Sequence, residues 1–309
     1  MSNARNSDRI DWQLVGSIAL IVLAPIGLMV YGMPKPQIKK ISKTQKYISF
    51  DLDKPDLSVL MPSALREISA LVVNDGGDHA LVVNDEVGKI YKVDLTSSDV
   101  SVLQTFKDSG DFEAIEKIND TIFVGESNGD IYRIVAADTR KIETRLSHSN
   151  DVEGLVYDAT RNRLLIACKG KAGKGKSFDK MRAIYSMPID SLKVDKKPAY
   201  LISIKKITEF AKKHLNYGVA PSMAKRFAPS AIAIEPQTGH LFIASSAARM
   251  LVVIDSNSQI LDIAHLDRTI HLQPEGLDFD ADGNLYLSNE GRSHRGVIYQ
   301  FKRRTRFEM

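Results

Sequence analysis

The chain has 309 residues, of which 43% are hydrophobic and 26% are charged, a composition typical of folded globular proteins and unlike that of disordered ones. Its net charge of +4 comes mainly from scattered lysines and arginines, which gives little support to nucleic-acid binding. The single cysteine, Cys168, excludes a disulfide within the chain.

The N-terminal region predicts a membrane anchor. No charged residue stands between Trp12 and Pro34, and this run is long enough to cross the hydrocarbon core of a bilayer as a helix. Trp12 and Tyr31 lie at its two ends, where aromatic rings favour the membrane interface. Because no small-residue cleavage site follows, we expect an uncleaved transmembrane signal anchor at 12–33.

The segments on either side of the anchor conflict over its orientation. The tail at 1–11 contains Arg5 and Arg9, whereas the linker at 34–46 contains five lysines. The positive-inside rule alone would keep the folded domain in the cytoplasm. Large domains can be exported despite such a bias, so charge leaves both orientations open.

Beyond the linker, residues 47–309 predict an all-β domain. Short apolar segments alternate with turns, and there is no sustained alternation of strands with long helices. The segments form five groups, which begin near Glu67, Phe112, Val152, Ser230 and Glu275. Most groups recur after about 40 to 50 residues, a spacing typical of propeller blades.

Two further segments complete the predicted five-bladed β-propeller. A helical insert near 206–227, with apolar residues at Ile207, Phe210 and Leu215, explains the longer interval between the third and fourth groups. The last group lacks an outer strand. We expect the alternating segment YISFDLD at 47–53 to supply it and thereby close the ring.

A glutamate recurs near the start of the first strand in four groups, at Glu67, Glu113, Glu153 and Glu275, with Ser230 in the fourth. Because first strands line the axis of a propeller, these carboxylates are expected to face one small volume. Like charges held close together need protons or a cation to offset them. An ion pair is the better interpretation of any single glutamate, but four matched positions favour a bound metal.

A second acidic set follows the second strands, at Asp85 or Glu86, at Glu126 and at Glu290, while the third group has Lys169 instead. These side chains are expected to form a mouth around the glutamates. No histidine or cysteine occupies a repeated position, which disfavours zinc and copper, whereas oxygen ligands suit Ca²⁺ and, less well, Mg²⁺. The predicted metal ligands are Glu67, Glu113, Glu153, Glu275, Glu126 and Glu290.

A lysine-rich segment resembles a nucleotide-binding motif. Residues 170–177 fit the phosphate-loop pattern G-x-x-x-x-G-K-S after an apolar strand. A phosphate loop must open a helix within a parallel βαβ sheet, but another β segment follows here. The segment therefore predicts a lysine-rich hairpin loop that can attract an anionic ligand or lipid headgroup.

Several of these motifs together resemble the SdiA-regulated family, the YjiK-like membrane-anchored β-propeller proteins. They are EISAL with LVVNDEVGKIYKVDL, DFEAI with IFVGESNGDIYRI, DVEGLVYD with RLLIACKG, and QPEGLDFDADGNLYLSNEG. The resemblance implies a five-bladed propeller, anchorage in the inner membrane of Gram-negative bacteria with the propeller in the periplasm, and a calcium site. It implies no known activity. Glu67, Glu113, Glu153 and Glu275 match the family's repeated positions, with Glu126 and Glu290 as neighbours.

The sequence therefore predicts a membrane-anchored calcium-binding propeller that acts as a binding or interaction module. Its expected partners are the membrane, through the N-terminal helix, and a small molecule or protein at the propeller mouth, but no nucleic acid. The alternative is a metal-dependent hydrolase of the lactonase or phosphoesterase type that uses the same metal. No serine has the context of a nucleophile elbow, so no catalytic residue is predicted.

Overall fold

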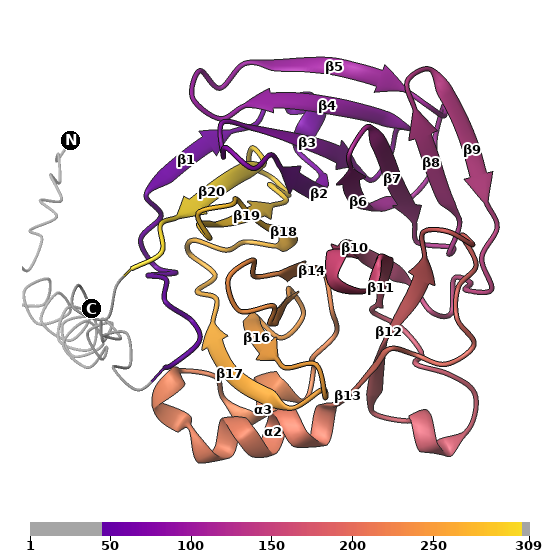
Figure 1. The fold of residues 1–309 in the computed structure, drawn as a ribbon. Coiled ribbons are helices and arrows are strands. Elements are labelled where there is room, and N and C mark those ends of the chain that lie inside the picture. The colour runs from indigo at the N-terminus through magenta and orange to yellow at the C-terminus, as the bar shows by residue number, and fades with distance from the viewer. Residues whose placement is uncertain (1–44, 305–309) are drawn as a thin grey trace, which may run out of the picture. The chain divides into compact units, whose positions relative to one another are not determined.

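The structure is a computed structural model that describes residues 45–304 and contains five four-stranded antiparallel sheets around a common axis (Figure 1). The first four sheets are continuous in sequence. The first blade contains β2 (Ile68–Val73), β3 (His79–Asn84), β4 (Lys89–Asp94) and β5 (Val100–Thr105), and the second contains β6 (Phe112–Ile118), β7 (Thr121–Glu126), β8 (Ile131–Val135) and β9 (Asp138–Ile142). The third blade contains β10 (Val152–Asp158), β11 (Arg163–Cys168), β12 (Met181–Pro188) and β13 (Tyr200–Ser203). The fourth contains β14 (Ala231–Ile234), β15 (Leu241–Ser245), β16 (Met250–Ile254) and β17 (Ile260–His265).

The fifth sheet joins the two ends of the domain, in the order β18 (Pro274–Phe279), β19 (Leu285–Asn289), β20 (Val297–Phe301) and β1 (Leu57–Leu60). The predicted five-bladed all-β propeller is thus confirmed, as is closure by a segment that precedes the first blade. The segment predicted for this role, 47–53, is wrong, because 57–60 pairs with β20 instead.

Residues 45–52 form a strap along the fourth and fifth blades. Ile48, Phe50 and Leu52 are buried in the core between these two blades. The backbone N–H groups of residues 46–48 donate to Asp262 Oδ2 over distances of 3.0, 3.0 and 3.3 Å. The alternating apolar pattern of residues 47–53 therefore reflects burial of every second side chain. The backbone N–H groups bond to the buried carboxylate of Asp262 and not to a neighbouring strand.

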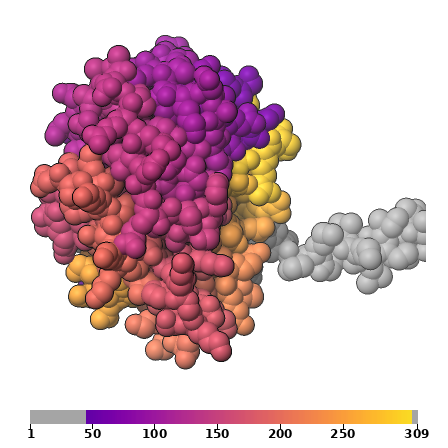
Figure 2. Space-filling view, turned by 90° about the vertical axis from the view of Figure 1, so that its right-hand side faces the viewer, coloured from indigo at the N-terminus to yellow at the C-terminus, as the bar shows by residue number. Residues whose placement is uncertain are grey.

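Five apolar clusters hold the ring together, and each combines residues from two adjacent blades. The first strands β2, β6, β10, β14 and β18 each contact the first strands of both neighbouring blades. A side view shows blades two and three as one continuous surface (Figure 2). Burial between blades therefore brings equivalent positions of the five first strands to one axis.

Short helices complete the described part: α2 (Ile204–Lys213), α3 (Pro221–Ala224) and the 3₁₀ turns Ser63–Leu65, Ala159–Arg161, Lys176–Phe178 and Leu215–Tyr217. The Ser203 hydroxyl caps α2 by accepting from the N–H of Lys206. Ile207 and Ala211 pack into the cluster between the third and fourth blades. The helical insert predicted near 206–227 is therefore present.

The predicted tail at 1–11 and transmembrane helix at 12–33 lie outside the described residues, as does the linker up to residue 44. Within residues 45–304, no helix is long and apolar enough to span a bilayer.

The strap contact gives a stability prediction. We expect Asp262→Ala to lower the free energy of unfolding by roughly 2–4 kcal/mol, because three amide donors lose one buried acceptor. Denaturant unfolding measures the change, with Asp138→Ala as a matched control, since Asp138 is exposed at the start of β9. Equal stability of the two variants would contradict this role of the strap.

Candidate functional site

The first strands of four blades contain a register shift near their start. Against the second strand, one extra residue stands between Ile68 and Ala70, and likewise in β6, β10 and β18. The extra residues at these β-bulges are Ser69, Glu113, Glu153 and Glu275. A bulge re-aims a side chain relative to the sheet. Three glutamates thereby enter the axial region from three different blades.

The register corrects the equivalence that was assumed for Glu67. Ser69 holds the bulge position in the first blade, and Glu67 lies two residues earlier. The carbonyl of Glu67 accepts from the N–H of Asp85, a bond that recurs from Ser127 to Asp111, from Lys169 to Asp151 and from Glu290 to Gln273. The triplets SAL, EAI, EGL, SAI and EGL, which start at residues 69, 113, 153, 230 and 275, each contain a small residue followed by an apolar one. Aligning the five first strands on these triplets gives this register from the sequence.

The same register divides the second acidic set. Asp85, Ser127, Lys169 and Glu290 are equivalent to one another, and Glu126 lies one residue earlier. Since adjacent residues of a strand point to opposite faces, the side chain of Glu126 points away from the position that Ser127 and its equivalents occupy. Its carboxylate bonds to Lys107 Nζ at 3.0 and 3.1 Å and accepts from the Tyr132 hydroxyl at 2.8 Å. Glu126 is thus held in an ion pair with Lys107, which follows the outer strand β5 of the first blade.

The other five predicted ligands do come together. A cavity of about 90 Å³ near the start of the first strands is lined by Glu67, Ile68, Ser69, Asp85, Glu113, Glu153, Lys169, Gln273, Glu275 and Glu290. Glu153 and Glu275 are buried, with 3% and 7% of their surface exposed. Six carboxyl groups therefore share this axial acidic cavity with one lysine.

Lys169 is the charged residue of the cavity whose role the sequence did not predict. It was read as a break in the acidic pattern, but its ammonium lies 2.8 Å from Glu153 Oε1. Burial by itself lowers the pKa of Lys169, but Glu153 and the other nearby carboxylates raise it above its ordinary value. Lys169 is thus a fixed cation inside the axial acidic cavity.

One ammonium does not neutralise the cavity. Burial, followed by the charges of Glu153 and Glu275, raises the pKa of Glu113 far above its ordinary value. Burial also raises the pKa of Glu275 to about 7, against the opposing effect of Lys169, and that of Asp85 to about 6. These carboxyl groups therefore hold protons at a pH where an exposed carboxyl group would not.

Some buried oxygen atoms of the cavity have no hydrogen-bond partner among the described residues, namely Glu275 Oε2 and Asp85 Oδ1. Gln273 is more fully engaged, since its amide donates to Glu290 Oε2 and accepts from Arg292 Nε. Buried polar atoms usually find a partner, so these two oxygens mark capacity for a donor or a cation.

Nothing in residues 45–304 meets the geometry of a formed metal centre, in the sense of three or more His, Cys, Asp or Glu side chains positioned to hold an ion. The carboxylates share a cavity but do not yet converge on one point. A cation would need their side chains to shift.

Comparison with solved structures finds matches of low sequence identity. A nidogen/laminin complex matches with 13% identity and a TM-score of 0.47, covering 72% of this chain and 72% of that chain. A streptogramin B lyase matches with 9% identity and a TM-score of 0.48 over 79% and 97% of the two chains. A luciferin-regenerating enzyme matches with 11% identity and a TM-score of 0.46 over 81% and 95%. These similarities carry no argument about activity.

No curated protein matches the sequence of this chain. The family model described as SdiA-regulated matches residues 189–301, which comprise β13 of the third blade, the helical insert, the fourth blade and the strands β18, β19 and β20 of the fifth blade. The resemblance to the SdiA-regulated family that the motifs indicated is thereby confirmed over this part of the chain.

Proposed function

We propose that the propeller is a cation-binding module whose site is the axial acidic cavity, with Ca²⁺ as the best-suited ion. The observation that carries the proposal is the charge imbalance, since six carboxyl groups share the cavity with one ammonium. Hard oxygen donors of this kind suit Ca²⁺, whose coordination is flexible enough for ligands from several blades. The unpartnered Oε2 of Glu275 supports the proposal, because it offers free lone pairs in a buried position.

Lys169 sets the affinity in this proposal. Its ammonium already occupies Glu153, so an incoming ion competes with a tethered cation for the same oxygen. A cavity of about 90 Å³ leaves room for an ion with a few water molecules beside the lysine. Calcium binding is then a local exchange in which carboxyl protons leave and Lys169 turns away from Glu153.

The wider role is that of a binding or interaction module held at a membrane. The inner-membrane anchor at 12–33 and the periplasmic position of the propeller are parts of this proposal that rest on the sequence. A metal-dependent hydrolase that uses the same cavity remains the alternative prediction from the sequence.

A calcium titration tests the proposal on the full chain. At about one hundred times its dissociation constant, Ca²⁺ should raise the melting temperature by roughly 5–10 °C. Glu275→Gln should weaken binding about tenfold or more, because it removes an anionic ligand. Lys169→Met should strengthen binding, because it removes the competing ammonium.

Glu209→Gln is the matched control, since Glu209 is an exposed glutamate on α2. It should behave as the unsubstituted chain does. Melting curves that superimpose with and without Ca²⁺, in both the unsubstituted chain and Lys169→Met, would overturn the proposal.

The buried carboxyl groups also predict a pH dependence in the presence of a chelator. Because the pKa values of Asp85 and Glu275 are about 6 and 7 in the fold, the folded state binds more protons than the unfolded state between about pH 4.5 and 7. These two groups alone should lower the free energy of unfolding by about 2–3 kcal/mol as pH rises from about 5.5 to 8. Denaturant titrations measure this slope, which Glu275→Gln should reduce. Stability that rises across this window would contradict the cavity electrostatics.

A further inference from the structure

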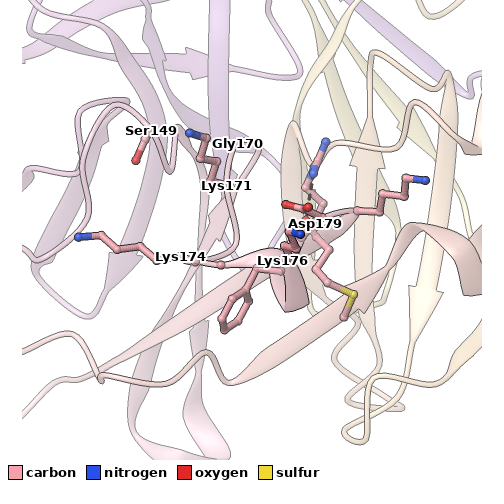
Figure 3. A pocket seen from close by; sticks show the side chains of 12 residues that line it. Ser149, Gly170, Lys171, Lys174, Lys176 and Asp179 are labelled. Atoms are coloured by element: carbon pink, nitrogen blue, oxygen red, sulfur yellow. Dashed lines mark hydrogen bonds between the residues drawn. The ribbon is translucent and has the colours of Figure 1, made fainter.

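A second, basic pocket lies outside the axial acidic cavity, in the loop between β11 and β12. It encloses about 630 Å³, and none of its lining residues lines the axial acidic cavity. Five cationic side chains line it together with a single carboxylate, that of Asp179; they are Lys171, Lys174, Lys176, Lys180 and Arg182 (Figure 3). This basic pocket takes no part in the proposed cation site.

The loop begins from a fixed backbone. The N–H groups of Gly170 and Lys171 donate to the carbonyls of Asn150 and Ser149 at 2.8 and 2.7 Å. A Cβ on Gly170 would lie 2.5 Å from the carbonyl oxygen of Ser149, so only glycine permits this approach. The first side of the pocket is therefore held against the loop that connects the second and third blades.

Further along, the loop is anchored to β12. The hydroxyl of Tyr185 donates to the carbonyl of the buried Ala172 at 3.0 Å. Gly175 has a φ of 98° and a ψ of 162°, a conformation almost confined to glycine. The backbone conformation at Gly175 therefore sets the direction of the chain between Lys174 and Lys176.

The positive charge of the pocket is largely uncompensated. Within residues 45–304, no ion pair joins any of its five cationic side chains to a carboxylate. Arg182 donates to the carbonyl of Met181 at 3.0 Å, but its buried Nε has no hydrogen-bond partner among the described residues. A half-buried guanidinium with an unpartnered donor, in a pocket that four lysines also line, offers a site for an anion.

We infer that the basic pocket binds a phosphate group, carried either by a small soluble phosphoester or by a lipid headgroup. A phosphate dianion offers two charges and several acceptor oxygens, which suits a pocket lined by four lysines and one planar guanidinium. The volume is in the range of small-molecule sites. Residues 170–177 do not form a nucleotide-binding phosphate loop, because β11 leads into the antiparallel strand β12 and only the 3₁₀ turn Lys176–Phe178 lies between them.

Phosphate binding to the full chain in neutral detergent micelles tests the inference, with two probes that separate the two sources. Inorganic phosphate represents the soluble ligand, and short-chain phosphatidic acid represents the lipid headgroup. Isothermal titration should show saturable binding of one or both probes. The double substitution Lys174→Gln with Lys176→Gln should weaken it at least about tenfold, because two charge-assisted bonds are lost.

The matched control is Lys196→Gln with Lys197→Gln, which removes the same charge from an exposed turn of the same blade. This control should bind like the unsubstituted chain. Binding of phosphatidic acid alone would assign the site to a lipid headgroup, and competition between the probes would assign it to the phosphate group itself. Absence of binding at millimolar concentrations of both probes, or equal weakening in both double variants, would overturn the inference.

Discussion

The ion pair between Lys169 and Glu153 is the interaction on which the axial acidic cavity depends. The propeller forces carboxyl groups from successive blades toward one axis, and burial there makes their charged forms costly. A tethered ammonium lowers this cost without filling the cavity, since it lies 2.8 Å from only one of the carboxylates. Burial raises the pKa of Asp85, Glu113 and Glu275, so protons offset part of the remaining charge, and in our proposal a divalent cation takes their place.

Much of this arrangement follows from the sequence, because blade repeats are local patterns. The number of blades, the helical insert and the convergence of Glu113, Glu153 and Glu275 could all be predicted from spacing and strand pattern. Placing Glu67 and Glu126 required the register, which a β-bulge shifts by one residue. The closing strand was missed because Val59 is its only buried residue, whereas the strap at 45–52 has the stronger apolar alternation.

Lys169 also connects two regions of opposite charge. Its side chain lies in the axial acidic cavity, and the next residue, Gly170, begins the loop that lines the basic pocket. In our proposals the cavity that contains Lys169 binds a cation, and the loop that starts at Gly170 binds a phosphate group. Such a separation of charge lets one domain hold two unlike ligands without neutralising either site.

The most direct test of the central claim is a crystal structure of the protein grown with Ca²⁺, read by anomalous scattering. Our account predicts an ion among the carboxylates of Glu113, Glu153 and Glu275, with Lys169 turned away from Glu153. A cavity that contains only water, with the ammonium of Lys169 still bonded to Glu153 at high calcium concentration, would contradict it.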